Sequence, residues 1–343
     1  MNVKIPELLA DPFGERSVAG IRRDLYVLGA RVRFESNSEK LLRLVDAAYA
    51  GLPRHRLSRV TPNLRVRLML TSSTRKRART EPTPLQMMSG AGLIGAATES
   101  SSFMVVSPED RAALVAVSPQ MLHFPYHTRY ELIEFAVFTL ATRVQGLVAL
   151  HAACVGDAGR GILLMGSSGA GKSTVTLQCL LDGLGFLAED SVFVAPDTLL
   201  ATGVSNYLHV RADSLRWIAQ ARSVARIRQS PVIARRSGVR KYEVDLRGSE
   251  YPLAERSLKI SAVVFLSAQH ATQQRGLLKR LTRAEALRRL AQEQAYAANQ
   301  PSWRSFTRAA VRLPFFELQR GRHPSEAVAV LRELIESPLR AAR

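Results

Sequence analysis

The sequence contains little cysteine and no long run of apolar residues. Only two of its 343 residues are cysteine, Cys154 and Cys179, and both fall in segments that we expect to be buried. We interpret them as packed core thiols in a reducing compartment, rather than as a disulfide or a metal-binding pair. No apolar run approaches the roughly 18–20 residues that a membrane span requires.

The first residues also lack the pattern of a secretory signal, which is a basic start followed by an apolar stretch. We therefore expect a cytoplasmic protein. A hydrophobic content of 46% is typical of globular chains, and the length of 343 residues predicts two domains.

Acidic residues are scarce relative to basic ones. The chain has 29 Asp and Glu against 48 Lys and Arg, which gives a formal net charge of +19, and most of the excess lies after Gln220. Such a balance indicates an acidic partner, a nucleic acid or a generally basic proteome. The basic residues after Gln220 are not interleaved with aromatic side chains, as they are in proteins that bind single-stranded nucleic acid. We therefore expect a solvated basic surface and no nucleic-acid partner, and the oligomeric state stays open.

A glycine-rich motif between residues 166 and 173 is the most informative part of the sequence. It consists of Gly166, Ser167, Ser168, Gly169, Ala170, Gly171, Lys172 and Ser173, and Thr174 follows it. The apolar run 162–165 before the motif predicts a buried strand, and the spacing of Leu177 and Leu180 after it predicts a helix. Strand, glycine-rich turn and helix form the context in which this motif binds phosphate.

The motif predicts how a nucleotide would be held. Its glycines allow backbone N–H groups to converge on phosphate oxygens, and the start of the helix adds the positive end of its dipole. Lys172 would bind the β- and γ-phosphates, and the Ser173 hydroxyl would coordinate Mg²⁺. We therefore expect ATP at residues 166–174, although a loop that grips phosphates does not identify the base.

Strands and helices alternate on both sides of the motif. Before it, the patterns predict strands over Asn63–Leu70, Phe103–Val106, Ala112–Val117 and Val148–Val155, a long loop over Thr71–Ser100, and a helix over Arg129–Val148. After it, they predict strands over Phe186–Val194, Lys259–Leu266 and Phe315–Leu318, and helices over Arg283–Ala298 and Ser325–Ile335. This order predicts an α/β sheet domain over residues 126–343, preceded by a smaller α+β domain of unknown role over residues 1–125.

Two further motifs accompany the glycine-rich loop. Leu150-His151-Ala152-Ala153 lies upstream of it, and Glu189-Asp190 lies seventeen and eighteen residues after Lys172. Together the three segments resemble the HPr kinase/phosphorylase family, whose core combines a His-Gly strand, a Gly-x-Ser-Gly-x-Gly-Lys-Ser loop and an Asp-Asp pair. They are closer still to shorter HPr-kinase-like proteins with a Leu-His-Ala-Ala strand, some of which phosphorylate serine on peptides. The resemblance covers residues 148–211 well and residues 259–336 loosely.

The resemblance implies an HPr-kinase-like P-loop domain and an ATP- and Mg²⁺-dependent kinase. Glu189 would then hold the position of the catalytic base, Asp190 and Ser173 would hold Mg²⁺, and His151 would lie beside the reacting phosphate. From the residues alone, His151 is equally well a satisfied core histidine, and the acidic pair is also explained as a solvated pair at a strand end. Both carboxylates can act at one site only if the backbone turns between them, because neighbouring residues on a strand point to opposite faces.

The chain departs from the family at two positions. Glu189 replaces the first aspartate, and His209 falls where the family has a glutamate that helps with the metal. Neutral imidazole suits Mg²⁺ poorly, so we do not expect His209 to take over that task. The basic stretch 235–241 corresponds to a loop that approaches the nucleotide or the substrate in relatives. Arg240 or Lys241 is expected to contact phosphoryl oxygens, and a surface loop without such a task fits the sequence equally well.

These inferences predict a kinase acting on a serine-type hydroxyl of a peptide or protein. Two alternatives remain open at this point. The same fold would also suit a kinase for a small hydroxyl compound, and a nucleotide-binding regulator would use the basic C-terminal half to contact nucleic acid.

Overall fold

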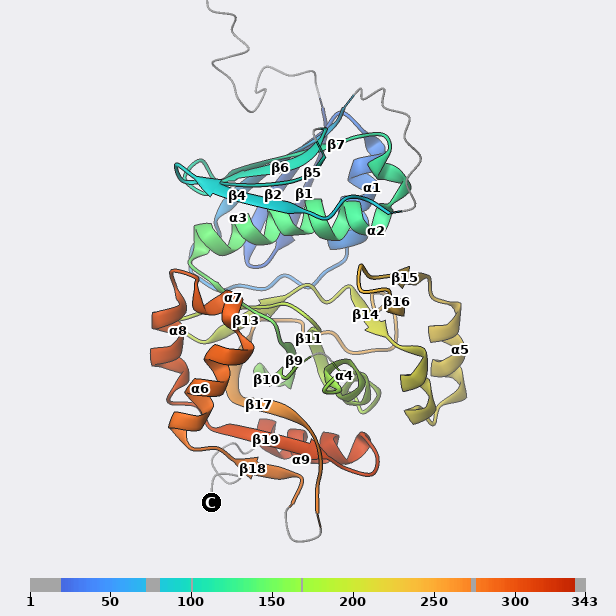
Figure 1. Cartoon of the computed structure of the whole chain (residues 1–343), viewed down its shortest axis with the longest axis vertical. Helices are drawn as coiled ribbons and strands as arrows, with labels where there is room; N and C mark the ends of the chain where they lie inside the picture. Colours follow the sequence, from blue (N-terminus) through green and yellow to red (C-terminus); the bar gives the residue numbers. More distant parts are fainter. Residues whose placement is uncertain (1–19, 72–80, 100, 168, 273–275, 337–343) are drawn as a thin grey trace, which may run out of the picture. The chain divides into compact units, whose positions relative to one another are not determined.

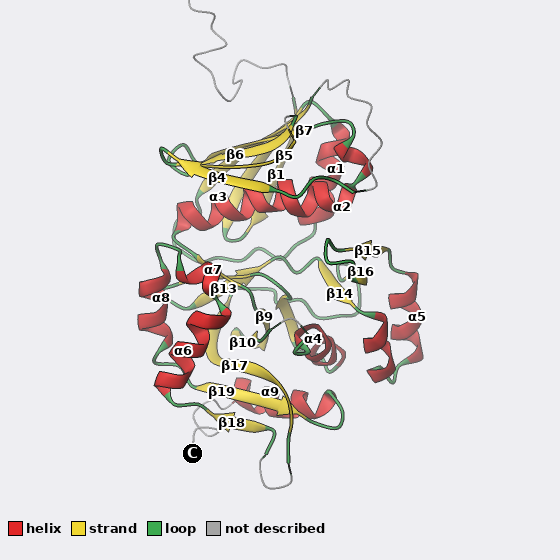
Figure 2. Ribbon diagram, viewed as in Figure 1, coloured by secondary structure: helices red, strands yellow, loops and turns green. Residues whose placement is uncertain are grey.

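The structure is a computed structural model that describes residues 20–71, 81–99, 101–167, 169–272 and 276–336. These residues form a mixed α/β structure whose larger sheets combine parallel and antiparallel strand pairs (Figures 1 and 2). Contacts divide the chain into two compact units, residues 1–50 with 61–144 and residues 51–60 with 145–343. No helix in the described part of the chain is both long and apolar enough to cross a membrane.

The first unit is a seven-stranded sheet in the order β1-β2-β3-β7-β6-β5-β4, with its helices packed on one face (Figure 1). Its strands are β1 (Ile21–Val27), β2 (Ala30–Ser36), β3 (Asn63–Leu70), β4 (Gln86–Gly90), β5 (Leu93–Glu99), β6 (Ser102–Ser107) and β7 (Ala112–Val117). Its helical segments are α1 (Glu39–Tyr49), η2 (Met121–His123), α2 (Pro125–His127), η3 (Thr128–Glu134) and α3 (Phe135–Gln145). The expected strands over 63–70, 103–106 and 112–117 are therefore confirmed.

The long loop expected over Thr71–Ser100 is wrong for its second half. Residues 86–99 form the β4–β5 hairpin, whose two-residue turn places Ala91 at φ 49° and Gly92 at φ 77°. Two consecutive residues with positive φ give the turn whose twist matches that of paired strands. The strands escaped prediction because β4 is exposed on both faces and has no apolar alternation. Residues 72–80 and 100 of the expected loop lie outside the described residues.

The unit boundary lies after Val144, later than the position near residue 125 suggested by the sequence. The helical stretch 125–145 packs its apolar side, including Leu132, Ala136 and Leu140, into the core of the first unit. Sequence reasoning assigned this helix to the following strand because the two are directly connected. The helix belongs to the first unit instead, because its apolar side is buried there.

The second unit is built on a nine-stranded sheet with helices on both faces (Figure 2). The strands of this sheet are β8 (Val148–Leu150), β9 (Ala153–Asp157), β10 (Arg160–Met165), β11 (Gly185–Ala188), β12 (Val192–Ala195), β13 (Leu200–Gly203), β17 (Leu258–His270), β18 (Leu278–Arg280) and β19 (Phe315–Arg320). Its helices are α4 (Lys172–Leu181), α6 (Arg283–Glu293), α7 (Ala295–Ala298), α8 (Trp303–Ala310) and α9 (Ser325–Glu336). The helix expected over 283–298 is broken at Gln294, which separates α6 from α7.

The core of this sheet lies around β10 and β17, which pair in parallel. Alternate residues point to opposite layers: Leu163 and Val263 join the cluster under α6 and α8, whereas Leu164 and Val264 join the cluster under α9. The continuous apolar runs of these strands follow from this two-sided burial. Both cysteines are free and buried, as expected, and burial raises the pKa of the Cys179 thiol to about 12.

A small third sheet, β14-β16-β15, completes the second unit. It comprises β14 (Tyr207–Val210), β15 (Val232–Ala234) and β16 (Arg240–Asp245), with η4 (Ala212–Trp217) and α5 (Ala221–Gln229) attached. Leu208, Val210 and Val244 of this sheet share one apolar cluster with Leu177 and Leu180 of α4. The small sheet is therefore packed against the helix that follows the glycine-rich loop.

Gly203 at the end of β13 offers a test of how tightly the sheet packs behind the acidic pair. A Cβ there would lie 2.5 Å from Ala188 Cβ and 2.7 Å from the Leu187 carbonyl oxygen. We expect Gly203→Ala to lower the free energy of unfolding by about 1–3 kcal/mol, the usual cost of overpacking. Urea unfolding measures this, with Gly276→Ala as the control, because no atom lies within 4 Å of a Cβ at that position. Equal stability of the two variants would contradict the packing.

Candidate functional site

The glycine-rich motif joins β10 to α4, as the sequence predicts, and its backbone depends on glycine. Gly171 has φ 104° and precedes the first helical residue, Lys172. Gly166 has φ 152°, and a Cβ there would come within 3.2 Å of the Leu266 carbonyl oxygen. A left-handed backbone and a close approach to β17 thus both require residues without side chains. Ser168 lies outside the described residues.

Lys172 is fixed at the floor of the loop. Its Nζ donates to the Gly166 carbonyl oxygen at 2.7 Å and lies 3.2 Å from His151 Nε2. The residue is only 7% exposed, although it lines an open cleft. Burial lowers the pKa of its ammonium group, and the attraction of Asp190 opposes this. The Lys172 ammonium group is therefore turned inward, where a phosphate-binding loop needs a cation.

Two breaks in neighbouring strands create the space opposite Lys172. The strand expected over 148–155 is interrupted at His151-Ala152, between β8 and β9. The strand expected over 186–194 is interrupted at Glu189-Asp190, between β11 and β12. Because β9 pairs with β11 and β8 pairs with β12, both breaks occur at the same place in the sheet. The backbone turns there, which is the condition for both carboxylates to reach one site.

His151 bridges the two breaks. Its Nδ1 lies 3.1 Å from the Asp190 carbonyl oxygen. If Nδ1–H donates to that oxygen, Nε2 is left as the acceptor for Lys172, so one tautomer satisfies both contacts. The His151 backbone is clamped by the Gln294 side chain, which accepts from its N–H at 2.8 Å and donates to its carbonyl at 2.9 Å. His151 is therefore held in the site by its backbone as well as by its ring.

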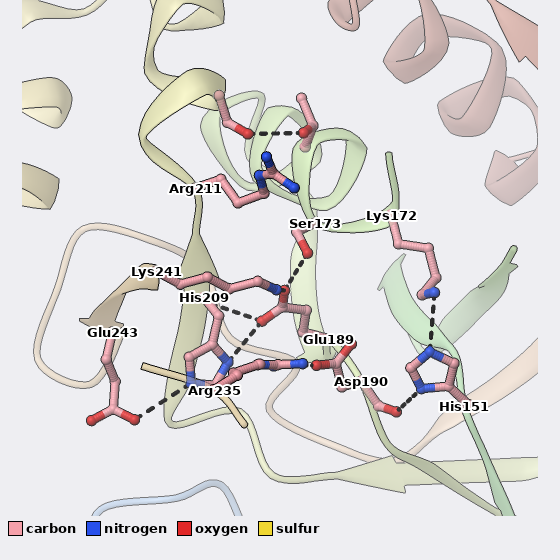
Figure 3. Close-up of polar contacts among 12 residues, drawn as sticks. His151, Lys172, Ser173, Glu189, Asp190, His209, Arg211, Arg235, Lys241 and Glu243 are labelled. Carbon is pink, nitrogen blue, oxygen red and sulfur yellow. Dashed lines mark hydrogen bonds and ion pairs between the residues drawn. The ribbon is translucent and has the colours of Figure 1, made fainter. Parts of the chain in front are cut away.

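Glu189 lies at the centre of the polar network in Figure 3. One carboxylate oxygen, Oε1, accepts the hydrogen bond of the Ser173 hydroxyl, and Lys241 Nζ lies 3.9 Å from the same oxygen. The other, Oε2, accepts from the His209 backbone N–H at 2.8 Å and lies 3.1 Å from His209 Nδ1. With only 4% of Glu189 exposed, four donors surround a buried carboxylate.

His209 sits between two buried carboxylates. It is the direct cross-strand partner of Glu243, whose Oε1 lies 3.4 Å from His209 Nε2 (Figure 3). Burial disfavours the charged imidazole, but the hydrogen bonds with Glu189 and Glu243 outweigh it and raise the pKa of His209 to about 9. Both ring nitrogens of His209 therefore face carboxylate oxygens.

Asp190 faces the cleft and is paired with Arg235. Arg235 Nη2 donates to Asp190 Oδ2 at 2.6 Å. Burial alone would raise the pKa of this carboxyl group, but the nearby charge and hydrogen bond of Arg235 hold it at about 2. Asp190 is therefore ionised at neutral pH, and the Arg235 guanidinium contacts one of its carboxylate oxygens.

A cleft of about 590 Å³ runs along these residues. Around the loop it is lined by Ser167, Gly169, Ala170, Gly171, Lys172, Ser173 and Thr174, and the facing wall includes His151, Asp190, Arg235 and Lys241. The predicted site residues in the described part of the chain are thus brought together around this cleft, but three of them do not line it directly. Gly166 and Glu189 stand behind the wall, and Arg240 does not line the cleft.

Arg240 does not line the cleft as expected; Lys241 and Arg235 do so instead. Arg240 and Lys241 are consecutive on β16 and point to opposite faces, so Lys241 enters the site and Arg240 stays exposed. Arg235 enters from the other arm of the β15–β16 hairpin. Sequence reasoning missed Glu243 and Gln294 altogether. Glu243 could have been found, because it lies two residues after Lys241 on the same strand and therefore on the same face. The sequence offers no comparable signal for Gln294.

The donor atoms fit a hard divalent cation and a nucleotide phosphate chain. Single ligand atoms of Glu189, Asp190 and His209 lie within 4.8 Å of one another. Since His209 is committed to two carboxylates, the oxygen donors of Ser173, Glu189 and Asp190 remain, and these suit Mg²⁺. The positive-φ glycines, the inward Lys172 and the N–H groups at the start of α4 suit phosphate oxygens.

Comparison with known proteins gives little beyond this geometry. No protein-family model matches the chain, and no curated protein sequence matches it significantly. One similar solved structure is the Hpr(Ser) kinase/phosphatase from Coxiella burnetii, at 11% identity and a TM-score of 0.30, over 57% of this chain and 99% of that one. A TM-score this low does not establish a shared fold, so no role is taken from it.

The His209 contacts make a stability prediction. His209→Leu leaves Glu189 and Glu243 buried without the cation between them, which should cost about 3–5 kcal/mol of unfolding free energy. The loss should be smaller in a Glu243→Gln background, because only one carboxylate then lacks its partner. Urea unfolding of the single and double variants measures the coupling, and His270→Leu, on an exposed strand end, is the control. Additive losses would mean that the three side chains do not act together.

Proposed function

We propose that the chain is an ATP- and Mg²⁺-dependent kinase that transfers the γ-phosphoryl group to a serine-type hydroxyl of a peptide or protein. The observation that carries the proposal is the contact between the Ser173 hydroxyl and Glu189, with Asp190 beside it on the open cleft. A P-loop serine and a carboxylate in contact form the arrangement that holds Mg²⁺ in P-loop phosphotransferases. The sequence resemblance to HPr-kinase-like proteins supports the same reading for the second unit.

Phosphoryl transfer requires mainly positioning and stabilisation of charge. Bound MgATP would supply the phosphoryl group and a metal that neutralises its charge. Lys172 and the loop amides would bind the phosphates, and Lys241 and Arg235 are placed to stabilise charge on the transferred group. Releasing Arg235 from Asp190 would free that carboxylate for the acceptor.

The geometry favours an exchange of the two acidic roles expected from the resemblance. Glu189 is buried and bound to Ser173, so it suits the metal side. Asp190 lines the cleft, so its Oδ atoms can orient an incoming hydroxyl and accept its proton. Because Glu189 and Asp190 lie in a bend of the backbone, their side chains can take different roles at the same site. We therefore assign Asp190 as the base and Glu189, with Ser173, as the metal side.

The nucleotide part of the proposal is tested with Lys172→Met. Lys172 makes charge-assisted contacts worth about 1.5–3 kcal/mol, so ATP affinity should fall roughly 10- to 150-fold. Isothermal titration with MgATP measures this, and Lys279→Met, on the exposed strand β18, is the matched control. Unchanged affinity in Lys172→Met would remove the loop from nucleotide binding.

The transfer step is tested with Asp190→Asn. Removing the base should lower the rate of transfer by about 10²- to 10⁴-fold while MgATP still binds. The assay follows label from γ-labelled ATP into a library of serine peptides, with Asp197→Asn, on an exposed turn, as the control. Competition by free serine separates a peptide acceptor from a small hydroxyl compound. Failure of the wild-type chain to label any hydroxyl acceptor while it binds MgATP would overturn the kinase assignment.

The regulator alternative has a separate signature. It predicts binding of DNA or RNA that weakens steeply with salt and persists in Lys172→Met. Absence of such binding favours the kinase.

A further inference from the structure

The cleft has a second end that the proposed chemistry does not use. Away from Asp190 it is lined by Val175 of α4, by Ser214 and Trp217 of η4, and by His323 in the turn before α9. Beside charged side chains such as Arg216 and Arg322, this end presents the aromatic rings of Trp217 and His323 and the apolar side chain of Val175. A difference in chemistry along one cleft indicates a ligand with two unlike parts.

Both walls of this end are fastened to α4. On the η4 side, Ser214 Oγ lies 3.1 Å from Thr174 Oγ1, and Gln178 Nε2 donates to the Trp217 carbonyl oxygen at 2.8 Å. Leu215 also packs with Leu177 in the apolar cluster beneath. Since Thr174 directly follows the predicted phosphate loop, η4 is held at a fixed position relative to that loop.

The other wall is an ordered turn. The His323 backbone N–H donates to Glu326 Oε1 at 2.8 Å, and His323 Nδ1 lies 2.7 Å from Ser325 Oγ. The helix that follows, α9, buries Ala327 and Val328 in the cluster that also contains Ala170 of the glycine-rich loop. His323 is therefore presented by a rigid helix start.

Planar groups from the two walls meet across the cleft. The Trp217 and His323 rings are 5.2 Å apart at 82°, an edge-to-face contact, and the Arg216 guanidinium carbon lies 4.8 Å from the centre of the Trp217 ring. The Trp217 indole thus has a flat group, the Arg216 guanidinium, near its face in this structure. Stacking of a base on an aromatic side chain contributes about 1–3 kcal/mol and tolerates different bases.

We propose that the nucleobase of the phosphate donor stacks in the pocket formed by Trp217, His323 and Arg216. The inference rests on the proposed function: the transferred group must lie between Lys172 and Asp190, so the nucleoside must extend along the cleft in the other direction. The pocket at that end supplies flat aromatic surfaces, so purines should be preferred for their larger ring area.

The chain offers a direct reporter, because it contains two tryptophans, Trp217 and Trp303. In a Trp303→Phe variant, the emission comes from Trp217 alone. MgATP should change this emission in a saturable way. Magnesium tripolyphosphate, which has no base, should compete for the same site without the same change. Trp217→Ala should weaken MgATP roughly 5- to 150-fold and leave tripolyphosphate affinity unaltered.

Two controls separate stacking from structural damage. Trp217→Phe keeps a flat ring and should recover most of the affinity, and Tyr296→Ala removes an aromatic side chain that is 63% exposed elsewhere on the second unit. Equal weakening of both ligands by Trp217→Ala, or an unchanged Trp217 signal at saturating MgATP, would overturn the base pocket while leaving phosphate binding intact. Binding of neither ligand to the unmodified chain would overturn the pocket and the proposed function together.

Discussion

The site depends on the buried carboxylate of Glu189, which side chains and backbone from three parts of the second unit contact. Glu189 accepts a hydrogen bond from Ser173 at the start of α4 and from His209 on β14, and Lys241 on β16 lies close to it. A carboxylate that is 4% exposed is costly unless its oxygens are matched by donors. The requirement to satisfy Glu189 therefore fixes the small sheet, the glycine-rich loop and the bend after β11 in one arrangement.

The bend itself follows from the sheet. Two paired strand ribbons, β9 with β11 and β8 with β12, are interrupted side by side, and the interrupted residues lose their ladder hydrogen bonds. The side chain of His151 and the amide of Gln294 replace part of that lost pairing. Where a strand breaks, side chains can replace the lost backbone partners. Residues at the break can then face a cleft while the buried backbone groups stay hydrogen-bonded. The same replacement explains why His151 is polar within an apolar segment.

Sequence patterns sufficed where chemistry and structure are local. The strand before the glycine-rich loop, the helix after it and the buried strand β17 follow from apolar spacing, and the loop residues follow from the motif. Patterns failed where tertiary context decides. Strand β4 carries no apolar alternation, and the breaks at His151 and Glu189 lie inside runs that read as continuous strands. The same holds for Gln294, whose partners are some 140 residues away in the chain. No local signal encodes a contact of that kind, because it exists only once the sheet has formed.

Glu189 and His209, the two positions at which the sequence differs from the pattern that it resembles, are in direct contact in this structure. A glutamate at position 189 extends further than an aspartate and reaches the Ser173 hydroxyl from the bend, and His209 supplies two donors to its other oxygen. A glutamate at position 209 would instead meet Glu189 and Glu243 as a third buried carboxylate. Like charges at such distances raise one another's pKa, so one of the three would stay protonated or the sheet would open. Histidine at position 209 therefore supplies the donors that a buried glutamate at position 189 requires, and the two side chains act as one unit.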